Sequence, residues 1–210
     1  TAIRASQLGM KTAIIERAEL GGICLNWGCI PTKALLKSAN VFDYINHAED
    51  YGIKIKGADA DFPAIVKRSR DVAEGMSNGI QFLMKKNKID VIKGTAKVKA
   101  GKKVDVTDDS GKVTEYAATN IVIATGARSK ELPFLQQDGK KIIGYREALT
   151  LPKLPKKMVV VGSGAIGVEF AYFYNAMGVD VTIVEFMDNI VPIEDVDVSK
   201  QLQRSFKKSG

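Results

Sequence analysis

The chain has few of the residues that bind metals or cross-link secreted proteins. Its 210 residues include two cysteines, one histidine and one tryptophan. A structural zinc site needs about four cysteine or histidine ligands, so we expect no metal site built from this chain alone. Two cysteines are also too few for the disulfide framework of a small secreted domain, and they favour a reducing compartment such as the cytoplasm.

Long apolar runs and one-sided charge are absent as well. No run approaches the ~18 apolar residues of a membrane-spanning helix, and no signal peptide is visible, so we expect no membrane contact. The net charge is +7, but 31 basic residues are mixed with 24 acidic ones. No arginine cluster or basic-aromatic pattern accompanies this charge, which disfavours nucleic acid as a partner. A hydrophobic content of 45% allows a buried core in one or two domains.

Both cysteines lie in one short segment that is rich in glycine. Gly21 and Gly22 precede Cys24, and Cys29 follows it closely. A disulfide between them would close so short a loop that we expect only about 2 kcal/mol of stabilisation, less than a long-range cross-link supplies. The spacing therefore favours a reversible switch over a structural cross-link, with two unrelated buried thiols as the alternative.

Cys29 stands directly before a predicted helix. Pro31 suits the first turn of a helix over residues 31–47, because proline lacks the N–H group that this turn leaves unpaired. Cys29 then lies at the helix N-terminus. Positions of this kind lower the pKa of a cysteine from ~8.5 to between ~3.5 and ~7.5. Cys29 is thus a candidate thiolate. His47, at the other end of this helix, is interpreted as a solvated residue and not as a catalytic base.

The C-terminal part contains a G-x-G-x-x-G turn in the setting that dinucleotide binding requires. A strand over residues 158–161 leads into the turn, a helix over 168–177 follows, and a strand over 181–185 ends in Glu185. Glycines allow a tight turn and close approach of a diphosphate, and the terminal acid accepts hydrogen bonds from a ribose. Gly167 and the absence of an arginine directly after Glu185, where Phe186 stands, favour NAD over NADP. The turn glycines are Gly162, Gly164 and Gly167.

The N-terminal part reads as the second half of another nucleotide-binding βαβ unit. A helix over residues 2–8 precedes a buried strand over 11–16, which ends in Glu16. The first strand and the Gly-rich turn of such a unit should precede this helix, and neither is present. We therefore expect that the chain opens inside the unit.

The middle of the chain changes from helix to strand. A long helix is predicted after Asp61, which suits its N-cap. A β-meander follows over residues 90–116, with a hairpin turn at 108–111. A buried strand over 121–124 then ends in Thr125, Gly126 and Ala127.

The cysteine segment closely resembles the redox-active segment of the pyridine nucleotide-disulfide oxidoreductases. The resemblance rests on the double glycine before the cysteines, Gly28 between them, and Pro31 and Lys33 after them. It spans essentially the whole chain and is strongest to the members that oxidise dihydrolipoamide. It implies an electron relay between dihydrolipoamide, a Cys24–Cys29 disulfide, FAD and NAD. Cys24 would meet dihydrolipoamide, and Cys29 would be held against the flavin.

The resemblance also implies the nucleotide contacts. Glu16 would bind the adenosine ribose of FAD, Gly94 would lie near the adenine, and Lys33 would contact the flavin. Glu169 matches a residue of the NAD segment near the flavin. The ordinary alternatives are a surface ion pair for Lys33 and Glu169 and a turn residue for Gly94. The other implied FAD contacts are Gly21, Gly22, Thr125, Gly126 and Ala127.

These observations predict an α/β chain with two Rossmann-like parts. An FAD-binding domain with an inserted β-meander would cover residues 1–151, and the start of an NAD-binding domain would cover 152–210. The family also has a second flavin-binding Gly-Asp segment and a C-terminal dimerisation domain, and neither is found before Gly210. We therefore expect an internal fragment, truncated at both ends and inactive alone, of a homodimeric enzyme of the cytoplasm or the mitochondrial matrix. The implied partners are the lipoyl domains of 2-oxo acid dehydrogenase complexes.

Two other functions stay open at this point. A sister reductase acting on a different disulfide or on mercuric ion would share the cysteine segment. A non-catalytic nucleotide-binding module with incidental cysteines is the alternative from another class, and its cysteines should form no reversible disulfide.

Overall fold

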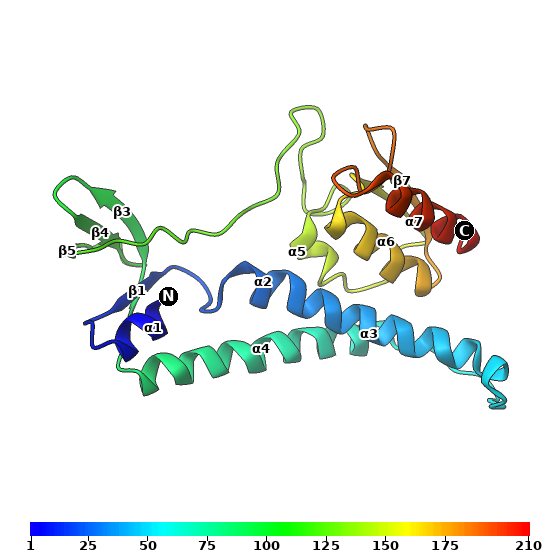
Figure 1. The fold of residues 1–210 in the computed structure, drawn as a ribbon, viewed down its shortest axis with the longest axis horizontal. Helices are drawn as coiled ribbons and strands as arrows, with labels where there is room; N and C mark the ends of the chain where they lie inside the picture. The colour runs from blue at the N-terminus through cyan, green and yellow to red at the C-terminus, as the bar shows by residue number, and fades with distance from the viewer. The chain divides into compact units, whose positions relative to one another are not determined.

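The computed structural model describes residues 1–210 as an α/β chain that divides into two compact units (Figure 1). Unit 1 comprises residues 1–26 and 73–128, and unit 2 comprises residues 27–72 and 129–210. The predicted division between residues 151 and 152 stays a prediction. No helix is both long and apolar enough to cross a membrane.

Unit 1 contains a parallel strand pair. Helix α1 (Ala2–Gln7) leads into β1 (Ala13–Glu16), which pairs in parallel with β2 (Asp90–Lys93). The hydroxyl of Ser6 donates a 2.5 Å hydrogen bond to the carbonyl of Asn87 and so ties α1 to the chain just before β2. The helix and strand predicted at the N-terminus are both confirmed.

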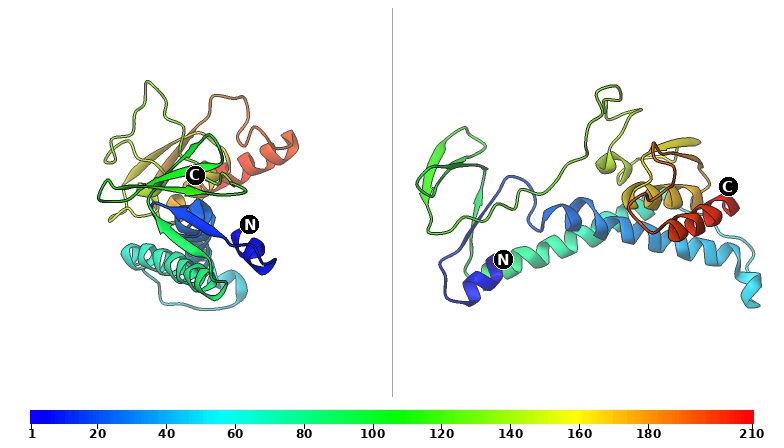
Figure 2. Two further views of the ribbon diagram at one scale, coloured as in Figure 1. Left: turned by 90° about the vertical axis from the view of Figure 1, so that its left-hand side faces the viewer. Right: turned by 45° about the horizontal axis from the view of Figure 1, so that its top comes forward.

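The predicted β-meander is present in unit 1 as a three-stranded antiparallel sheet. Its strands β3 (Thr95–Lys99), β4 (Lys103–Thr107) and β5 (Val113–Ala117) lie side by side in that order (Figure 2). The central strand buries Val104 and Val106 on one face, as alternation along a strand requires.

The strand predicted over residues 121–124 does not form. Val122 and Ile123 lie in an irregular segment and are 66% and 72% exposed. An apolar run becomes a strand only where a neighbour pairs with its backbone groups, and the β1–β2 pair gains no third strand. The prediction was therefore wrong for this segment.

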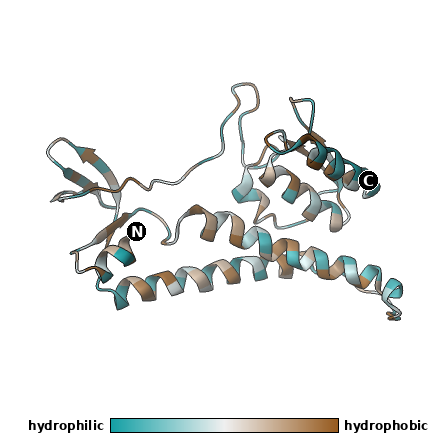
Figure 3. Cartoon of the chain, viewed as in Figure 1, coloured by the Kyte–Doolittle hydropathy of each residue, from teal (hydrophilic) through white to brown (hydrophobic).

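Two long helices follow the first cysteine in the sequence. Helix α3 (Cys29–Asn46) is followed by a short 3-10 helix η1 (Ala48–Tyr51), and α4 (Phe62–Lys86) begins after Asp61. The Asp61 carboxylate accepts a 3.0 Å hydrogen bond from the Ala64 N–H, which confirms the predicted N-cap. Hydrophobic and hydrophilic residues alternate along α4 (Figure 3).

Unit 2 contains a second parallel strand pair in a strand–turn–helix–strand arrangement. Strand β6 (Lys157–Val161) leads into α6 (Ala165–Ala176), and β7 (Asp180–Val184) returns to pair in parallel with β6. Helix α7 (Val196–Lys208) follows and is largely hydrophilic. This order confirms the elements predicted around the Gly-rich turn.

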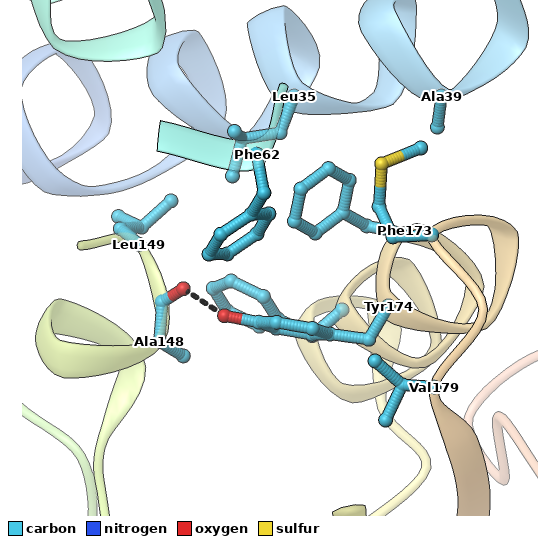
Figure 4. Close-up of a cluster of buried hydrophobic side chains, with 10 residues drawn as sticks. Leu35, Ala39, Phe62, Ala148, Leu149, Phe173, Tyr174 and Val179 are labelled. Atoms are coloured by element: carbon cyan, nitrogen blue, oxygen red, sulfur yellow. Dashed lines mark hydrogen bonds between the residues drawn. The ribbon is translucent and has the colours of Figure 1, made fainter. Parts of the chain in front are cut away.

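The core of unit 2 packs α3 and α6 around aromatic side chains (Figure 4). Phe62 stacks on Phe173 with ring centroids 6.2 Å apart. The buried hydroxyl of Tyr174 donates a 2.5 Å hydrogen bond to the carbonyl of Ala148, at the end of the short helix α5 (Tyr145–Ala148). Burial raises the pKa of Tyr174. The other labelled members are Leu35, Ala39, Leu149 and Val179.

Candidate functional site

The two cysteines are joined in a disulfide at the junction of two helices. Cys24 lies in helix α2 (Gly22–Trp27), and Cys29 is the first residue of α3. Both residues are exposed. The pairing and the position of Cys29 at a helix N-terminus are confirmed, whereas α2 was not predicted, because a Gly-Gly pair is typical of a turn.

Buried polar residues hold the segment that carries Cys24. The side-chain amide of Asn26 donates hydrogen bonds of 2.9 and 3.0 Å to the carbonyls of Leu20 and Gly22. The buried hydroxyl of Ser77, in α4, donates a 3.1 Å hydrogen bond to the same Leu20 carbonyl. These contacts fix the chain just before Cys24, so that the sulfur projects from a defined backbone.

The start of α3 is fixed in a similar way. Thr32 donates to the carbonyl of Gly28 through both its N–H, at 3.1 Å, and its hydroxyl, at 2.7 Å. Pro31 is fully buried beside it. Cys29 thus lies in an ordered first turn, where the unpaired backbone N–H groups of the helix favour a thiolate once the disulfide opens.

Lys33 and Glu169 are brought together in unit 2. The ammonium group of Lys33, on α3, forms an ion pair with the carboxylate of Glu169, on α6. Their side chains are 59% and 29% exposed, so the pair contributes little to stability. An ordinary surface ion pair explains this contact equally well. The predicted roles of Lys33 and Glu169 at the cofactors therefore stay predictions.

The Gly-rich turn between β6 and α6 requires glycine at two positions, at one for its backbone conformation and at the other for lack of space. Gly162 has a φ of +97°, which side chains rarely adopt. A Cβ atom on Gly167 would lie 2.1 Å from the carbonyl oxygen of Gly162. Helix and strand therefore approach each other as closely as the fingerprint requires. Gly164, the N-cap of α6, supplies no side-chain cap.

Glu185 faces this turn from the end of β7. One carboxylate oxygen accepts hydrogen bonds from the N–H of Ser163, at 2.9 Å, and from its hydroxyl, at 2.6 Å. The other oxygen accepts from the N–H groups of Phe186, at 2.8 Å, and Met187, at 3.0 Å. These bonds, the Ser163 hydroxyl first, lower the pKa of Glu185 from 4.5 to about 2. Ser163 was not predicted as part of the site, although its place inside the Gly-rich turn was a usable signal.

The structure brings together only some of the residues of unit 1 that were predicted to bind FAD. Glu16 ends β1, its carboxylate accepts a 2.9 Å hydrogen bond from the Ala18 N–H, and its carbonyl accepts one of 3.1 Å from the Gly94 N–H. A Cβ on Gly94 would lie 2.6 Å from the Thr107 carbonyl oxygen, so the fold itself requires glycine there. The predicted contacts at residues 125–127 lie in the exposed irregular segment. Gly22 is the first residue of α2, and Gly21 directly precedes it.

Comparison with known proteins gives a match over the full chain. The model of a family described as pyridine nucleotide-disulphide oxidoreductase matches residues 1–210. The crystal structure of LpdA from Mycobacterium tuberculosis superposes with a TM-score of 0.89 at 28% identity, and the match covers 100% of this chain and 46% of that one.

Curated relatives extend this result. The chain is 50% identical over 224 residues to a dihydrolipoyl dehydrogenase from Rhizobium etli, a match that covers 100% of this chain and 47% of the relative. It is also 50% identical over 209 residues to one from Chlorobaculum tepidum, covering 100% of this chain and 45% of the relative. The chain thus spans about half the length of the relatives that it matches.

Proposed function

Because this chain belongs to the pyridine nucleotide-disulphide oxidoreductase family, we propose that it carries the redox disulfide and parts of both nucleotide sites of an NAD-dependent dihydrolipoyl dehydrogenase. The observation that carries the proposal is the exposed Cys24–Cys29 disulfide, which ends on the first residue of α3. Relatives named dihydrolipoyl dehydrogenase support the choice of substrate.

The proposed reaction at the disulfide is an exchange with a dithiol. One thiolate of dihydrolipoamide attacks the Sγ of Cys24, which forms a mixed disulfide and releases Cys29 as a thiolate. The second substrate thiolate then attacks the substrate sulfur of that mixed disulfide, which releases lipoamide and Cys24. Two electrons pass from the substrate to the cysteine pair, and the two thiol protons go to the pair or to solvent. The N-terminus of α3 stabilises the Cys29 thiolate as leaving group.

The residues around the Gly-rich turn fit NAD. Gly162 and Gly167 allow the tight turn and the close helix–strand approach, and Gly164, the N-cap of the 12-residue helix α6, leaves open space for a diphosphate at the helix N-terminus. Glu185 directly follows β7 as a carboxylate, and ribose hydroxyls would bind it by replacing some of the four donors that it has in this structure.

The residues of unit 1 fit the adenosine part of FAD. The half-buried Glu16 ends a parallel strand, and its carboxylate accepts a hydrogen bond from the Ala18 N–H at one oxygen, which leaves acceptor capacity for ribose hydroxyls. When bound, FAD would accept the electron pair of the dithiol and exchange a hydride with NAD. The proposal includes a homodimer and the lipoyl domains of 2-oxo acid dehydrogenase complexes as partners.

Two serine variants test the proposal in the intact enzyme. Cys24→Ser should lower the rate of dihydrolipoamide turnover by about a thousandfold or more, because no disulfide can form. It should keep an absorbance band from charge transfer between the Cys29 thiolate and bound flavin. Cys29→Ser should abolish both turnover and the band. Equal spectra for the two variants would contradict the assigned roles.

Substrate choice is a separate measurement. Purified enzyme should oxidise dihydrolipoamide with NAD and show no reduction of glutathione disulfide or mercuric ion. Strong activity on either of these would favour the sister reductase instead. A cysteine pair that never cycles between disulfide and dithiol would favour a non-catalytic nucleotide-binding module.

A further inference from the structure

Two arginines lie over the ring of the only tryptophan, which stands between the cysteines. Trp27 is the last residue of α2, and only Gly28 separates it from Cys29. The guanidinium carbons of Arg70 and Arg146 lie 4.1 and 4.7 Å from the centroid of the Trp27 ring. Both distances are well inside the ~6 Å range of cation–π contacts, for which tryptophan is the best aromatic partner.

The arginines come from elements far apart in the sequence. Arg70 lies in α4 and is half-buried. Arg146 lies in α5, where its Nε donates a 3.3 Å hydrogen bond to the hydroxyl of Tyr145, over whose ring it also lies. Trp27, Arg70 and Arg146 all belong to unit 2. The indole ring is therefore held by two separate helices of one compact unit.

Trp27 is well placed to control the geometry of the cysteine pair. It lies on the short segment that the disulfide closes, and it is half-buried although both cysteines are exposed. The disulfide fixes this segment while it is intact. Once the disulfide is reduced, only non-covalent contacts keep the two sulfurs close. The stacking of the arginines on Trp27 is such a contact, and Trp27 lies between the two cysteines in the sequence.

We propose that Arg70 and Arg146 are positioning residues for the redox pair. By holding the Trp27 ring, they keep Cys24 and Cys29 close enough to re-form their disulfide after each reduction. The inference rests on the proposed function, since it requires that the pair cycles. It assigns no contact with substrate or cofactor to either arginine.

The sign of the effect follows from chain entropy. Without the stack, the dithiol form gains conformational freedom that it must lose when the disulfide closes. The equilibrium then shifts toward the dithiol, and the reduction potential becomes less negative. We expect the equilibrium constant for ring closure to fall by about three- to tenfold, which corresponds to a shift of about 14 to 30 mV for a two-electron couple.

The test measures this potential in the intact protein. Purified protein is equilibrated in a series of dithiothreitol redox buffers, in which the reagent loses two electrons and two protons to the cysteine pair and closes to its own cyclic disulfide. The samples are quenched, alkylated and digested with trypsin. Both cysteines lie in the single peptide from Ala18 to Lys33, so mass spectrometry of this peptide gives the fraction reduced directly.

The variants separate the stack from general loosening. Arg70→Gln, Arg146→Gln and Trp27→Leu should each make the potential less negative, and Trp27→Phe should restore part of the difference because it keeps an aromatic face. Arg68→Gln is the matched control. Arg68 lies in the same helix and donates a 2.9 Å hydrogen bond to the Ala34 carbonyl of α3, but it is not over the Trp27 ring.

Three outcomes would overturn the inference. These are an unchanged potential in the arginine and tryptophan variants, an equal shift in Arg68→Gln, and a more negative potential on loss of either arginine. The last would show that the cations act by stabilising thiolates and not by positioning. Failure of the proposed function looks different, since the wild-type peptide would then show no reversible change between disulfide and dithiol at all.

Discussion

The chain contains two parallel strand pairs, and each has a glutamate where a strand ends: Glu16 is the last residue of β1, and Glu185 directly follows β7. In the β6–β7 pair, the carboxylate of Glu185 accepts four hydrogen bonds, two of them from Ser163 in the Gly-rich turn. In the β1–β2 pair, the carboxylate of Glu16 accepts one, from its own neighbour Ala18. The difference shows that a tight turn facing a strand end adds donors to its carboxylate, since Ser163 supplies two at Glu185 and no such turn supplies any to Glu16.

The largest expected effect contrasts one glycine from each unit. Gly167→Ala places a Cβ 2.1 Å from the Gly162 carbonyl oxygen, so the Gly-rich turn must shift. We expect it to weaken NADH binding by about a hundredfold or more and to lower the free energy of unfolding by about 1–3 kcal/mol. Calorimetric titration with NADH and urea denaturation of the intact enzyme measure the two effects.

Gly94→Ala is the matched control. Its Cβ would lie 2.6 Å from the Thr107 carbonyl oxygen, and its φ is +152°. We expect a similar loss of stability, again about 1–3 kcal/mol, with NADH affinity kept. An equal loss of NADH affinity in both variants would remove the contrast between the two units.

The next effect concerns the choice between NADH and NADPH. A 2′-phosphate at the ribose would meet the carboxylate of Glu185, and like charges at such close range repel strongly. We expect the intact enzyme to prefer NADH by about a hundredfold or more in kcat/KM, and Glu185→Gln to narrow that preference at least tenfold. Glu16→Gln should leave it unchanged. Comparable efficiency with both nucleotides in the wild type would show that Glu185 does not exclude the phosphate.

The pH dependence of stability sharpens the same comparison. The pKa of Glu185 is lowered from 4.5 to about 2, mainly by the Ser163 hydroxyl. A lowered pKa in the folded state stabilises the fold above the pKa of the unfolded chain, and this contribution is lost as the pH falls from about 4.5 to about 2. Glu185→Gln should therefore make the free energy of unfolding fall less steeply in that pH range. Ser163→Ala should move the fall to higher pH. Wild-type and variant profiles of identical shape would contradict the assignment.

Local sequence signals explain why the site of unit 2 was predictable. Strand, glycine turn, helix and strand follow one another without interruption between residues 157 and 184, and each signal depends on neighbouring residues alone. Pro31 in the same way marked the start of α3. The predicted strand over residues 121–124 failed because a strand depends on a partner elsewhere in the chain. The stacking of Arg70 and Arg146 on Trp27 could not be predicted, because the spacing of residues along the chain does not show which distant helices pack together.

The smallest expected effect is that of the Lys33–Glu169 ion pair. Lys33 is 59% exposed, so water screens the attraction. A double-mutant cycle with Lys33→Gln and Glu169→Gln should give a coupling of at most about 1 kcal/mol in the free energy of unfolding. A larger loss of activity than of stability in the single variants would favour the predicted roles at the cofactors over a surface ion pair.

The central claim is that Cys24 and Cys29 exchange electrons with a dithiol substrate. The most direct measurement adds dihydrolipoamide anaerobically to the intact, oxidised enzyme without NAD and counts free thiols in the peptide from Ala18 to Lys33. The account predicts that the disulfide opens to two alkylatable thiols and closes again when NAD is added. A disulfide that stays closed under dihydrolipoamide, or thiols that stay open after NAD, would contradict it.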